Sequence, residues 1–417
     1  MIFRPTTRRV ALQIDGVVLD YFTDVGITRD LAEISASFEL SMRDPARSLQ
    51  AWPYATPDYP FLPPINWGGE AILSIDNESV LIGWVDDVNP VAGDNPSLSI
   101  AGRDKTGDLA DCTANPTGPS EYKNLDLLEI AKRLCKPFGI SVSADVDVGE
   151  PFKRFTIDKS ETVLSALEKG ARQRAVLIVS DGIGGLLLTR SGQTRAPGNL
   201  ILPGNIISSS GKYSMRERYS DYYVKGQAER AGGKRQAEPA LDVTAQPLGD
   251  NGMARAAPRR SKPDAGFEKA GVTIQGHARD EEITRYRPLV SQAKTQCTAV
   301  SAQTQAEWMA RVAEGKGTQF SALVKDWRIE GGLWRPNELA LVDDAYQDVN
   351  RDLLISGVEY RYGEGGEETG LRLVGPEAFD LIPMADRKKN KKRKGGGKGK
   401  GKGKKSSGPL DGTAQGL

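Results

Sequence analysis

The stretch that decides the fold class is residues 10–22, Val10-Ala-Leu-Gln-Ile14-Asp-Gly-Val-Val-Leu-Asp-Tyr-Phe22. Apolar side chains at Val10, Leu12 and Ile14 alternate with their neighbours, which is the period of a strand with one buried face. Asp15-Gly16 then supplies a tight hairpin turn, because glycine tolerates a positive φ. The stretch therefore predicts two paired antiparallel strands.

The same kind of pattern continues to about residue 105. Further strand-like runs occupy Ile34–Leu40, Ala71–Ile75, Val80–Val88 and Ser97–Ala101. Asp76-Asn77 marks a turn between two of them. Six or seven short strands of this kind predict a small barrel or sandwich, so residues 1–105 are interpreted as a first β-barrel domain.

Residues 106–205 have a different pattern and predict a compact α+β domain, in the order helix, strand, strand, repeated once. The first helix has its apolar stripe between Leu127 and Cys135, with Asn124 as its expected cap. Asp158 and Glu161 resemble a capping box before the second helix. The strands are expected at Ile140–Ala144, Phe152–Ile157, Ala175–Ser180 and Leu186–Arg190. The repeated order suggests an internal duplication.

Strand patterns resume after this domain and predict a second, similar β-barrel from residues 206–227 plus 318–385, with residues 213–227 as its first strand. Residues 228–317 are interpreted as an inserted irregular and helical region, with a helix around Ala306–Ala313. Within it, residues 228–269 contain few large apolar groups, and we expect them to be mobile in the free subunit. Residues 386–417 form a basic tail rich in lysine and glycine, which is expected to be disordered.

Charge is distributed unevenly along the chain. The formal net charge is +1, yet residues 387–405 hold twelve Lys and Arg and no acid. The chain before residue 387 contains 44 of the 56 basic residues and 54 of the 55 acidic residues, since only Asp411 follows it. Its net charge is therefore negative. This negatively charged part of the chain repels nucleic acid, so only the basic tail is expected to attract nucleic acid. Three cysteines, no signal-peptide pattern and no long apolar run lead us to expect a soluble chain made in a cytoplasm, without membrane insertion.

The sequence offers few groups for catalysis or metal binding. His277 is the one histidine, and a thiol dyad with Cys297 has no protease signature around it. Adjacent acids at Asp86-Asp87 and Asp343-Asp344 point to opposite faces of a strand, so neither pair acts on one sugar; they are interpreted as solvated strand ends. No catalytic, cofactor or metal site is expected, and single substitutions of His277, Cys297 or Asp86 are expected to leave assembly intact.

Several ordered segments resemble the baseplate hub proteins of Mu-like phages. They are Ile82–Asp86, Ser99–Cys112, Ile130–Ile140, Leu167–Arg172, Leu188–Arg190, Arg218–Gln227, Gly332–Asn337 and Leu353–Val358, spread over roughly residues 10–383. The resemblance implies a structural, non-enzymatic subunit of a contractile phage tail that carries no cofactor.

The resemblance further implies a homotrimeric ring in which two similar barrels per subunit adapt the six-fold tail tube to the three-fold central spike. The implied partners are the spike, the tail tube protein and the baseplate wedge proteins, with the tape-measure protein as a further candidate. Nucleic acid is at most a transient partner. The implied location is the virion, in the tail baseplate, after assembly in the host cytoplasm.

Three sets of residues are candidates for interactions. One set is the aromatic side chains Trp52, Tyr54, Tyr59, Phe61 and Trp67, which either form a subunit interface or cap the first barrel locally. Arg103 is expected to pair with an acid at the junction between the first two domains. The tail supplies Lys388, Lys391, Arg393, Lys398, Lys400 and Lys402, which either dock on an acidic protein surface or remain solvated.

Three other functions remain as alternatives. A gene transfer agent or a tailocin would use the same type of hub, and the neighbouring genes would separate these from a phage. A hub with cell-wall-degrading activity would need a hydrolase site and would give a signal in a zymogram. A nucleic-acid-binding protein acting through the tail would show salt-dependent DNA binding.

Overall fold

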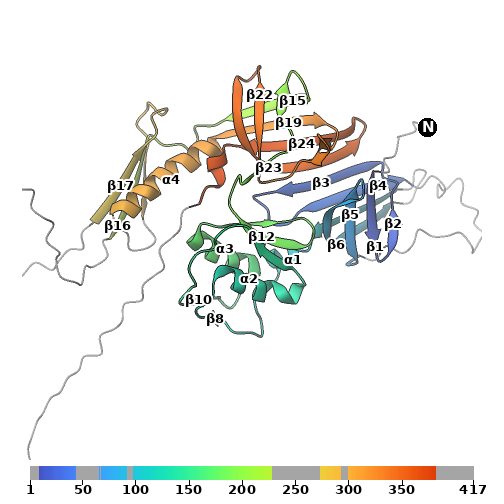
Figure 1. Cartoon of the computed structure of the whole chain (residues 1–417), viewed down its shortest axis with the longest axis horizontal. Coiled ribbons are helices and arrows are strands. Elements are labelled where there is room, and N and C mark those ends of the chain that lie inside the picture. The colour runs from blue at the N-terminus through green and yellow to red at the C-terminus, as the bar shows by residue number, and fades with distance from the viewer. Residues whose placement is uncertain are drawn as a thin grey trace, which may run out of the picture. The chain divides into compact units, whose positions relative to one another are not determined.

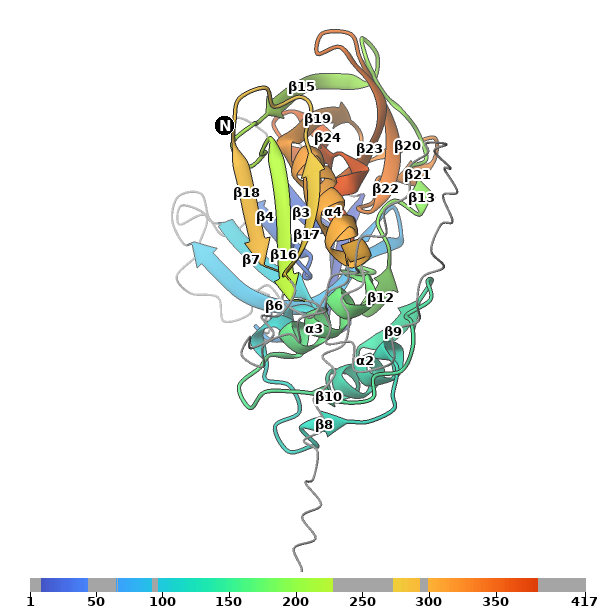
Figure 2. The same ribbon diagram turned by 90° about the vertical axis from the view of Figure 1, so that its left-hand side faces the viewer.

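The computed structural model describes residues 9–43, 65, 67–91, 97–227, 273–292 and 299–381, and its chain is mainly β, as predicted (Figures 1 and 2). The first region holds seven strands: β1 (Val10–Ile14), β2 (Val17–Leu19), β3 (Asp24–Asp30), β4 (Ser37–Arg43), β5 (Glu70–Ile75), β6 (Glu78–Val91) and β7 (Ser97–Asp104). The predicted β1–β2 hairpin is confirmed by the pairing of Leu12 with Leu19. Its turn has a positive φ at Asp15 and Gly16.

Strand β3 was not anticipated from the sequence. Only Val25 and Ile27 alternate as buried apolar residues in it, and the strand ends in Thr-Arg-Asp. Two apolar positions are too few for a strand pattern to stand out. This strand nevertheless occupies a central place in the fold, because it pairs with β4 on one side and with a strand of the second β region on the other.

The α+β domain follows directly. Its elements are α1 (Gly107–Asp111), β8 (Glu121–Tyr122), α2 (Leu127–Cys135), a 3-10 turn (Lys136–Phe138), β9 (Ser141–Ala144), β10 (Phe155–Thr156), α3 (Val163–Arg174), β11 (Leu177–Ser180) and β12 (Gly185–Thr189). Both predicted helices are present. Their N-cap residues differ from the prediction: the Asp126 side chain accepts from the Glu129 amide at 2.7 Å, and Thr162 accepts from the Ser165 amide. The predicted contact between Asp158 and Glu161 is present ahead of the second helix, where the Glu161 carboxylate accepts from the Asp158 amide at 2.9 Å.

The expected internal duplication of this domain does not extend to the pairing of its strands. β9 pairs in parallel with β12 and joins β11 in one sheet, whereas β10 pairs with β8 in another. The helix-strand-strand order is therefore repeated along the chain but not in the pairing of the strands. The domain has its own hydrophobic core, which the stripes of α2 and α3 fill.

The second β region contains β13 (Thr194–Arg195), β14 (Leu200–Leu202), β15 (Ile206–Tyr213), β19 (Thr318–Lys325), β20 (Arg328–Ile329), β21 (Gly332–Leu333), β22 (Glu338–Asp344), β23 (Val349–Gly363) and β24 (Gly366–Val374), followed by a 3-10 turn (Pro376–Phe379). Its main strands lie in the order β15-β19-β24-β23, with β22 beside β23. The first region has the order β3-β4-β7-β6-β5. The two regions are therefore repeats of one strand arrangement.

The two repeats are not separate closed barrels, which corrects that detail of the predicted fold. Residues Gly357–Tyr362 of β23 pair with Val25–Asp30 of β3, so one sheet of fourteen strands runs through both repeats (Figure 1). One hydrophobic core likewise includes residues from both. The backbone groups at the edge of the first repeat are satisfied by the second repeat rather than by closure on itself.

The chain between β15 and β19 contains a small separate layer. Strands β16 (Asp221–Gln227), β17 (Thr273–Arg279) and β18 (Pro288–Gln292) form a three-stranded sheet, and α4 (Ala299–Gly317) packs on one face of it (Figure 2). The predicted helix around Ala306–Ala313 is part of α4. The expectation that residues 213–227 form the first strand of the second barrel is wrong for β16, because Val224 faces Ala302 and Ala306 in this separate core. β15 takes that place instead.

Replacing Ile27 with Ala should test the junction between the repeats. Its side chain is fully buried in the shared core, so the substitution should lower the free energy of unfolding by about 2–4 kcal/mol. Urea unfolding followed by fluorescence gives the value. Ile183→Ala, in the exposed turn between β11 and β12, is the matched control and should change stability by less than about 0.5 kcal/mol. Equal effects at the two positions would contradict the shared core.

Candidate functional site

The carboxylate of Asp104, at the end of β7, links three parts of the chain. It accepts hydrogen bonds from the Ser35 hydroxyl at 3.1 Å and the Ala36 amide at 3.1 Å, both between β3 and β4. It also accepts from the Thr106 amide at 3.0 Å. The Ser180 hydroxyl of the α+β domain donates to it at 2.6 Å. Since the side chain is buried, these donors stabilise its charge in place of water.

A cavity of about 230 Å³ between the two repeats and the α+β domain is lined by Ala36 and Ser180, two of the residues that bind this carboxylate. Arg29 reaches into it from β3 and its guanidinium approaches the Ser180 carbonyl at 3.4 Å. Glu338, from β22, has a carboxylate oxygen that is buried without a hydrogen-bond partner. Burial raises the pKa of Glu338 to about 7. The cavity is therefore lined by a desolvated acid, whose charge Arg335 and Arg29 compensate only in part.

Ion pairs connect the two repeats on another side. Asp76, in the turn between β5 and β6, pairs with Arg9 at 2.6 Å and with Arg328 of the second repeat at 3.0 Å. Arg9 also contacts Asp326 and Glu367 of the second repeat. The hydrogen bonds from Arg9 and then Arg328 hold the pKa of Asp76 at about 2. A network of this kind favours one relative placement of the repeats more than isolated surface pairs do.

Arg103 pairs with acids, as expected for the domain junction. Its guanidinium contacts Asp86 of β6 and Asp111 of α1, each at 2.9 Å. The indole N–H of the neighbouring Trp84 donates to Asp108 at 3.1 Å. Together these contacts attach the first helix of the α+β domain to the first repeat. A role for Arg103 in assembly stays a prediction.

Of the adjacent acids, Asp344 departs from the prediction of a solvated strand end. It is buried and accepts hydrogen bonds from the amides of Tyr346 and Gln347 and from the Ser209 hydroxyl. The turn after β22 therefore folds around its carboxylate, which the sequence did not signal. Asp86 and Asp87 are exposed, as predicted, but they lie inside β6, at its bulge, and not at a strand end.

His277 lies on β17 with a partly exposed side chain. Its ring stacks on Tyr223 with centroids 4.5 Å apart, and Nε2 lies 2.9 Å from the Asp221 carboxylate. The expected surface position is confirmed, but the ring takes part in local contacts of the small sheet. Cys297 lies outside the described residues, so the structure does not test the dyad.

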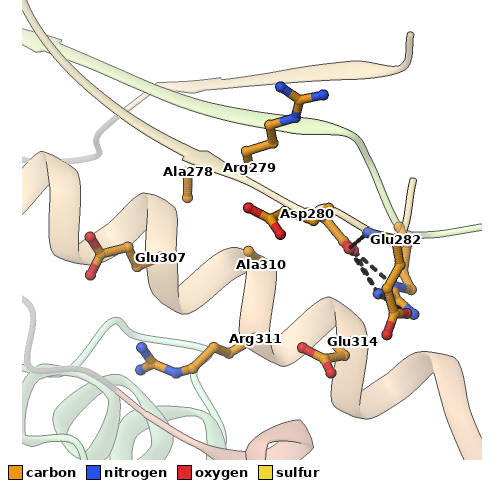
Figure 3. A pocket seen from close by; sticks show the side chains of 10 residues that line it. Ala278, Arg279, Asp280, Glu282, Glu307, Ala310, Arg311 and Glu314 are labelled. Atoms are coloured by element: carbon orange, nitrogen blue, oxygen red, sulfur yellow. Dashed lines mark hydrogen bonds and ion pairs between the residues drawn. The ribbon is translucent and has the colours of Figure 1, made fainter. Parts of the chain in front are cut away.

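A second hollow, of about 420 Å³, lies between α4 and the end of β17 (Figure 3). At one end of it, Arg218 forms a buried pair with Asp280 at 2.8 Å. Glu307 and Glu314 line it from α4. Its lining contains no histidine, cysteine, serine or threonine, so it provides no nucleophile of the hydroxyl or thiol type.

Apart from short strands such as β2, which ends the large sheet on the other side, two edges of long strands lack a neighbouring strand within the described residues. One is β15, whose outer side has no partner and which exposes Ile207 and Tyr213. The other is the second half of β6, where pairing with β5 stops at Trp84 and Val91 is exposed. Free strand edges accept further strands through their backbone groups, so these are candidate assembly surfaces.

The remaining predicted interaction residues are only partly described. Trp67 is 78% exposed, and the choice between a subunit interface and a local cap on the first barrel stays a prediction. The aromatic residues Trp52, Tyr54, Tyr59 and Phe61, the tail residues Lys388, Lys391, Arg393, Lys398, Lys400 and Lys402, and residues 228–269 lie outside the described residues. Their roles stay predictions. The free edges of β15 and β6 were missed, because a strand's pairing partners cannot be read from its own pattern.

Over the described ranges, no group of three or more His, Cys, Asp or Glu residues is placed to hold a metal ion. In the same part of the chain, no helix has the length and apolar character needed to cross a membrane.

Comparison with known proteins gives consistent matches along the chain. Residues 9–104 match the N-terminal domain of Mu phage baseplate assembly protein GpP-like proteins, residues 106–190 the second domain of baseplate hub protein gp44-like proteins, and residues 298–382 the fourth domain of GpP. The baseplate hub protein gp44 of Escherichia phage Mu is 32% identical over 389 residues, covering 92% of this chain and 91% of that protein.

Two solved structures are also similar. The 43 kDa tail protein of prophage MuSo2 from Shewanella oneidensis has a TM-score of 0.71 and 30% identity, covering 89% of this chain and 99% of that one. A tail protein from Neisseria meningitidis has a TM-score of 0.66 at 17% identity, with 90% and 99% covered, and so shares the fold.

Replacing Asp104 with Ala should remove the acceptor of the Ser180 hydroxyl and of the Ala36 and Thr106 amides, whereas the Ser35 hydroxyl keeps the Ala36 carbonyl as an acceptor. The expected loss in the free energy of unfolding is about 2–4 kcal/mol. Asp86→Ala removes an exposed pair with Arg103 and should lose less than about 1 kcal/mol. Thermal unfolding of both variants in one buffer measures this difference, and similar losses would show that Asp104 is not central to the junction.

Replacing Glu338 with Gln should change the pH dependence of stability. The pKa of Glu338 is raised in the folded state, so ionisation penalises the fold as the pH rises from about 4.5 through 7. The Gln variant should therefore gain about 1–2 kcal/mol relative to the parent at pH 8 and little at pH 4. Glu39→Gln, on an exposed face of β4, is the control. A gain independent of pH would rule out the buried acid as its cause.

Proposed function

We propose that this chain, which belongs to the family of Mu-like phage baseplate hub proteins, forms a homotrimeric ring that adapts the six-fold tail tube to the three-fold central spike. Membership makes the chain a structural baseplate hub protein of a phage tail and a component of the virion. The trimer and its role as an adaptor between tube and spike are the proposal and do not follow from family membership alone.

The observation that carries the proposal is the repeated strand order. The strands β3-β4-β7-β6-β5 and β15-β19-β24-β23-β22 are arranged alike, so each chain presents two similar units. Three chains then present six such units to a six-fold tube. The same three chains present three copies of the α+β domain, which matches the symmetry of a three-fold spike. A closed ring with this property requires heterologous contacts between copies.

The proposed partners follow from the same placement. They are the central spike protein, the tail tube protein and the baseplate wedge proteins, with the tape-measure protein as a further candidate. We propose a scaffold role rather than an enzymatic one, supported by relatives that are named as baseplate hub and tail proteins. Assembly in the host cytoplasm, before incorporation into the contractile tail, completes the proposal.

The purified chain, alone or co-expressed with its spike partner, should form a ring with three times the mass of the 45.1 kDa subunit. Light scattering with detection of absolute mass, combined with negative-stain microscopy, measures the mass and the shape. A chain that stays monomeric in both preparations contradicts the proposal, and so does a ring with a number of copies other than three.

A further inference from the structure

We propose that β15 of one copy pairs in antiparallel fashion with residues 87–91 of β6 in the next copy, and that the ring closes through this contact. The inference rests on the proposed ring and identifies the surfaces that form it. Its source is the contact between the two repeats within one chain, for which the structure supplies a template.

The two repeats can be superimposed strand by strand through a shared irregularity. β6 has a bulge between Val85 and Asp87 where it pairs with β7. β23 has a bulge between Ile355 and Gly357 where it pairs with β24. Bulges are specific local features and fix the register between equivalent strands.

The correspondence continues into the next two strands. Val85 lies opposite Gly102, which lies opposite Phe38. In the second repeat, Ile355 lies opposite Leu373, which lies opposite Phe320. The two phenylalanine side chains are both buried in the shared core. β6 therefore corresponds to β23, β4 to β19, and β3 to β15.

Within the chain, only one of the two equivalent contacts is made. β3 of the first repeat pairs with residues 357–362 of β23, the half that extends beyond β22. The strand equivalent to β3 in the second repeat is β15, and it has no neighbour on that side within the described residues. The equivalent half of β6 extends beyond β5 in the same way. A second copy would supply the missing partner to each.

Exposure of the equivalent residues supports this reading. In the contact that is made, Ile27 and Val358 are fully buried. In the strands whose partner is missing, β15 is exposed at most positions and β6 exposes its end at Val91. Leu31, which follows β3, is 7% exposed, whereas Met215, at the equivalent place after β15, is 46% exposed. Apolar groups at these positions favour a protein partner over solvent.

A second copy fits these edges better than an unrelated strand does. The two edges lie on different repeats, so a copy that offers its β15 to one neighbour still offers its β6 to the other. Repetition of one contact with a constant rotation then produces a closed ring. Pro90 removes one backbone donor from the β6 edge, which limits indiscriminate pairing and leaves part of the specificity to side chains.

The template also predicts the register. Arg29 pairs with Val358 and Thr28 with Glu359 in the intramolecular contact. By correspondence, Tyr213 lies opposite Val88 of the next copy, and Lys212 lies opposite Asn89. Residues that face each other in an antiparallel pair have Cα atoms about 4.5–5.5 Å apart, a separation that a disulfide spans.

A cysteine pair tests this register directly. Lys212→Cys combined with Asn89→Cys, in the full chain carrying Cys112→Ser and Cys297→Ser, should give covalent trimers on mild oxidation. Cys135 stays in place, because its thiol is buried and its pKa is raised to about 12. The matched control combines Lys225→Cys, at an exposed position of β16, with Asn89→Cys and should give no covalent trimers. A mixture of the two single variants should give covalent dimers.

Hydrogen exchange of the unmodified chain provides a measurement that needs no variant. Peptides covering residues 206–213 and 86–91 should both exchange at least tenfold more slowly in the assembled ring than in the monomer. A trimer in which neither segment slows and the cysteine pair does not cross-link contradicts this inference and leaves the proposed function standing. A chain that is monomeric alone and with its spike contradicts both.

Discussion

The backbone pairing of β3 with β23 is the contact on which the rest of the structure depends. It joins the repeats into one sheet, so that Ile27 of the first repeat and Tyr360 of the second lie opposite each other in a common core. Without it, each repeat would expose a strand edge and an apolar face. The buried hydroxyl of Tyr360 donates to the Trp334 carbonyl, which extends the contact into the loop between β21 and β22.

Polar contacts attach the α+β domain to this sheet, together with Ile34 of the first repeat, which packs against the hydrophobic cluster of that domain. Its hydrophobic cluster is separate, yet Asp104 and Arg29 reach it from the first repeat. Buried polar contacts require specific geometry and so define orientation more sharply than apolar contacts do. The cost is visible at Glu338, whose buried oxygen lacks a partner in the same region.

Much of the architecture could be predicted from the sequence because the relevant patterns are local. The β1–β2 hairpin, α2, α3 and the β11–β12 hairpin each depend on alternation, an apolar stripe or a turn residue within a short window. β3 and the true place of β16 could not be predicted this way. β3 has only two apolar positions, and its burial comes from a strand more than 300 residues away. Tyr222 and Val224 read as an ordinary strand pattern, and nothing within that pattern indicates that α4 covers it.

The candidate surfaces show the same limit. Arg103 could be predicted as half of an ion pair because charged residues cluster around it in the sequence, whereas Asp104 acquires its importance from donors at Ser35 and Ser180 that are distant along the chain. The lack of a neighbouring strand on the outer side of β15 likewise follows from the order of strands in the whole sheet.

The wide separation of β3 from its partner has a consequence for synthesis. Val25 pairs with Tyr362, which is 337 positions later in the sequence, so a nascent chain cannot complete the sheet until nearly all of it has left the ribosome. Contacts of such long range form late, because closing the intervening loop costs entropy before any pairing compensates it. During that interval the first repeat displays an open edge to other nascent chains. Production of this protein is therefore expected to be sensitive to translation rate and to chaperone supply.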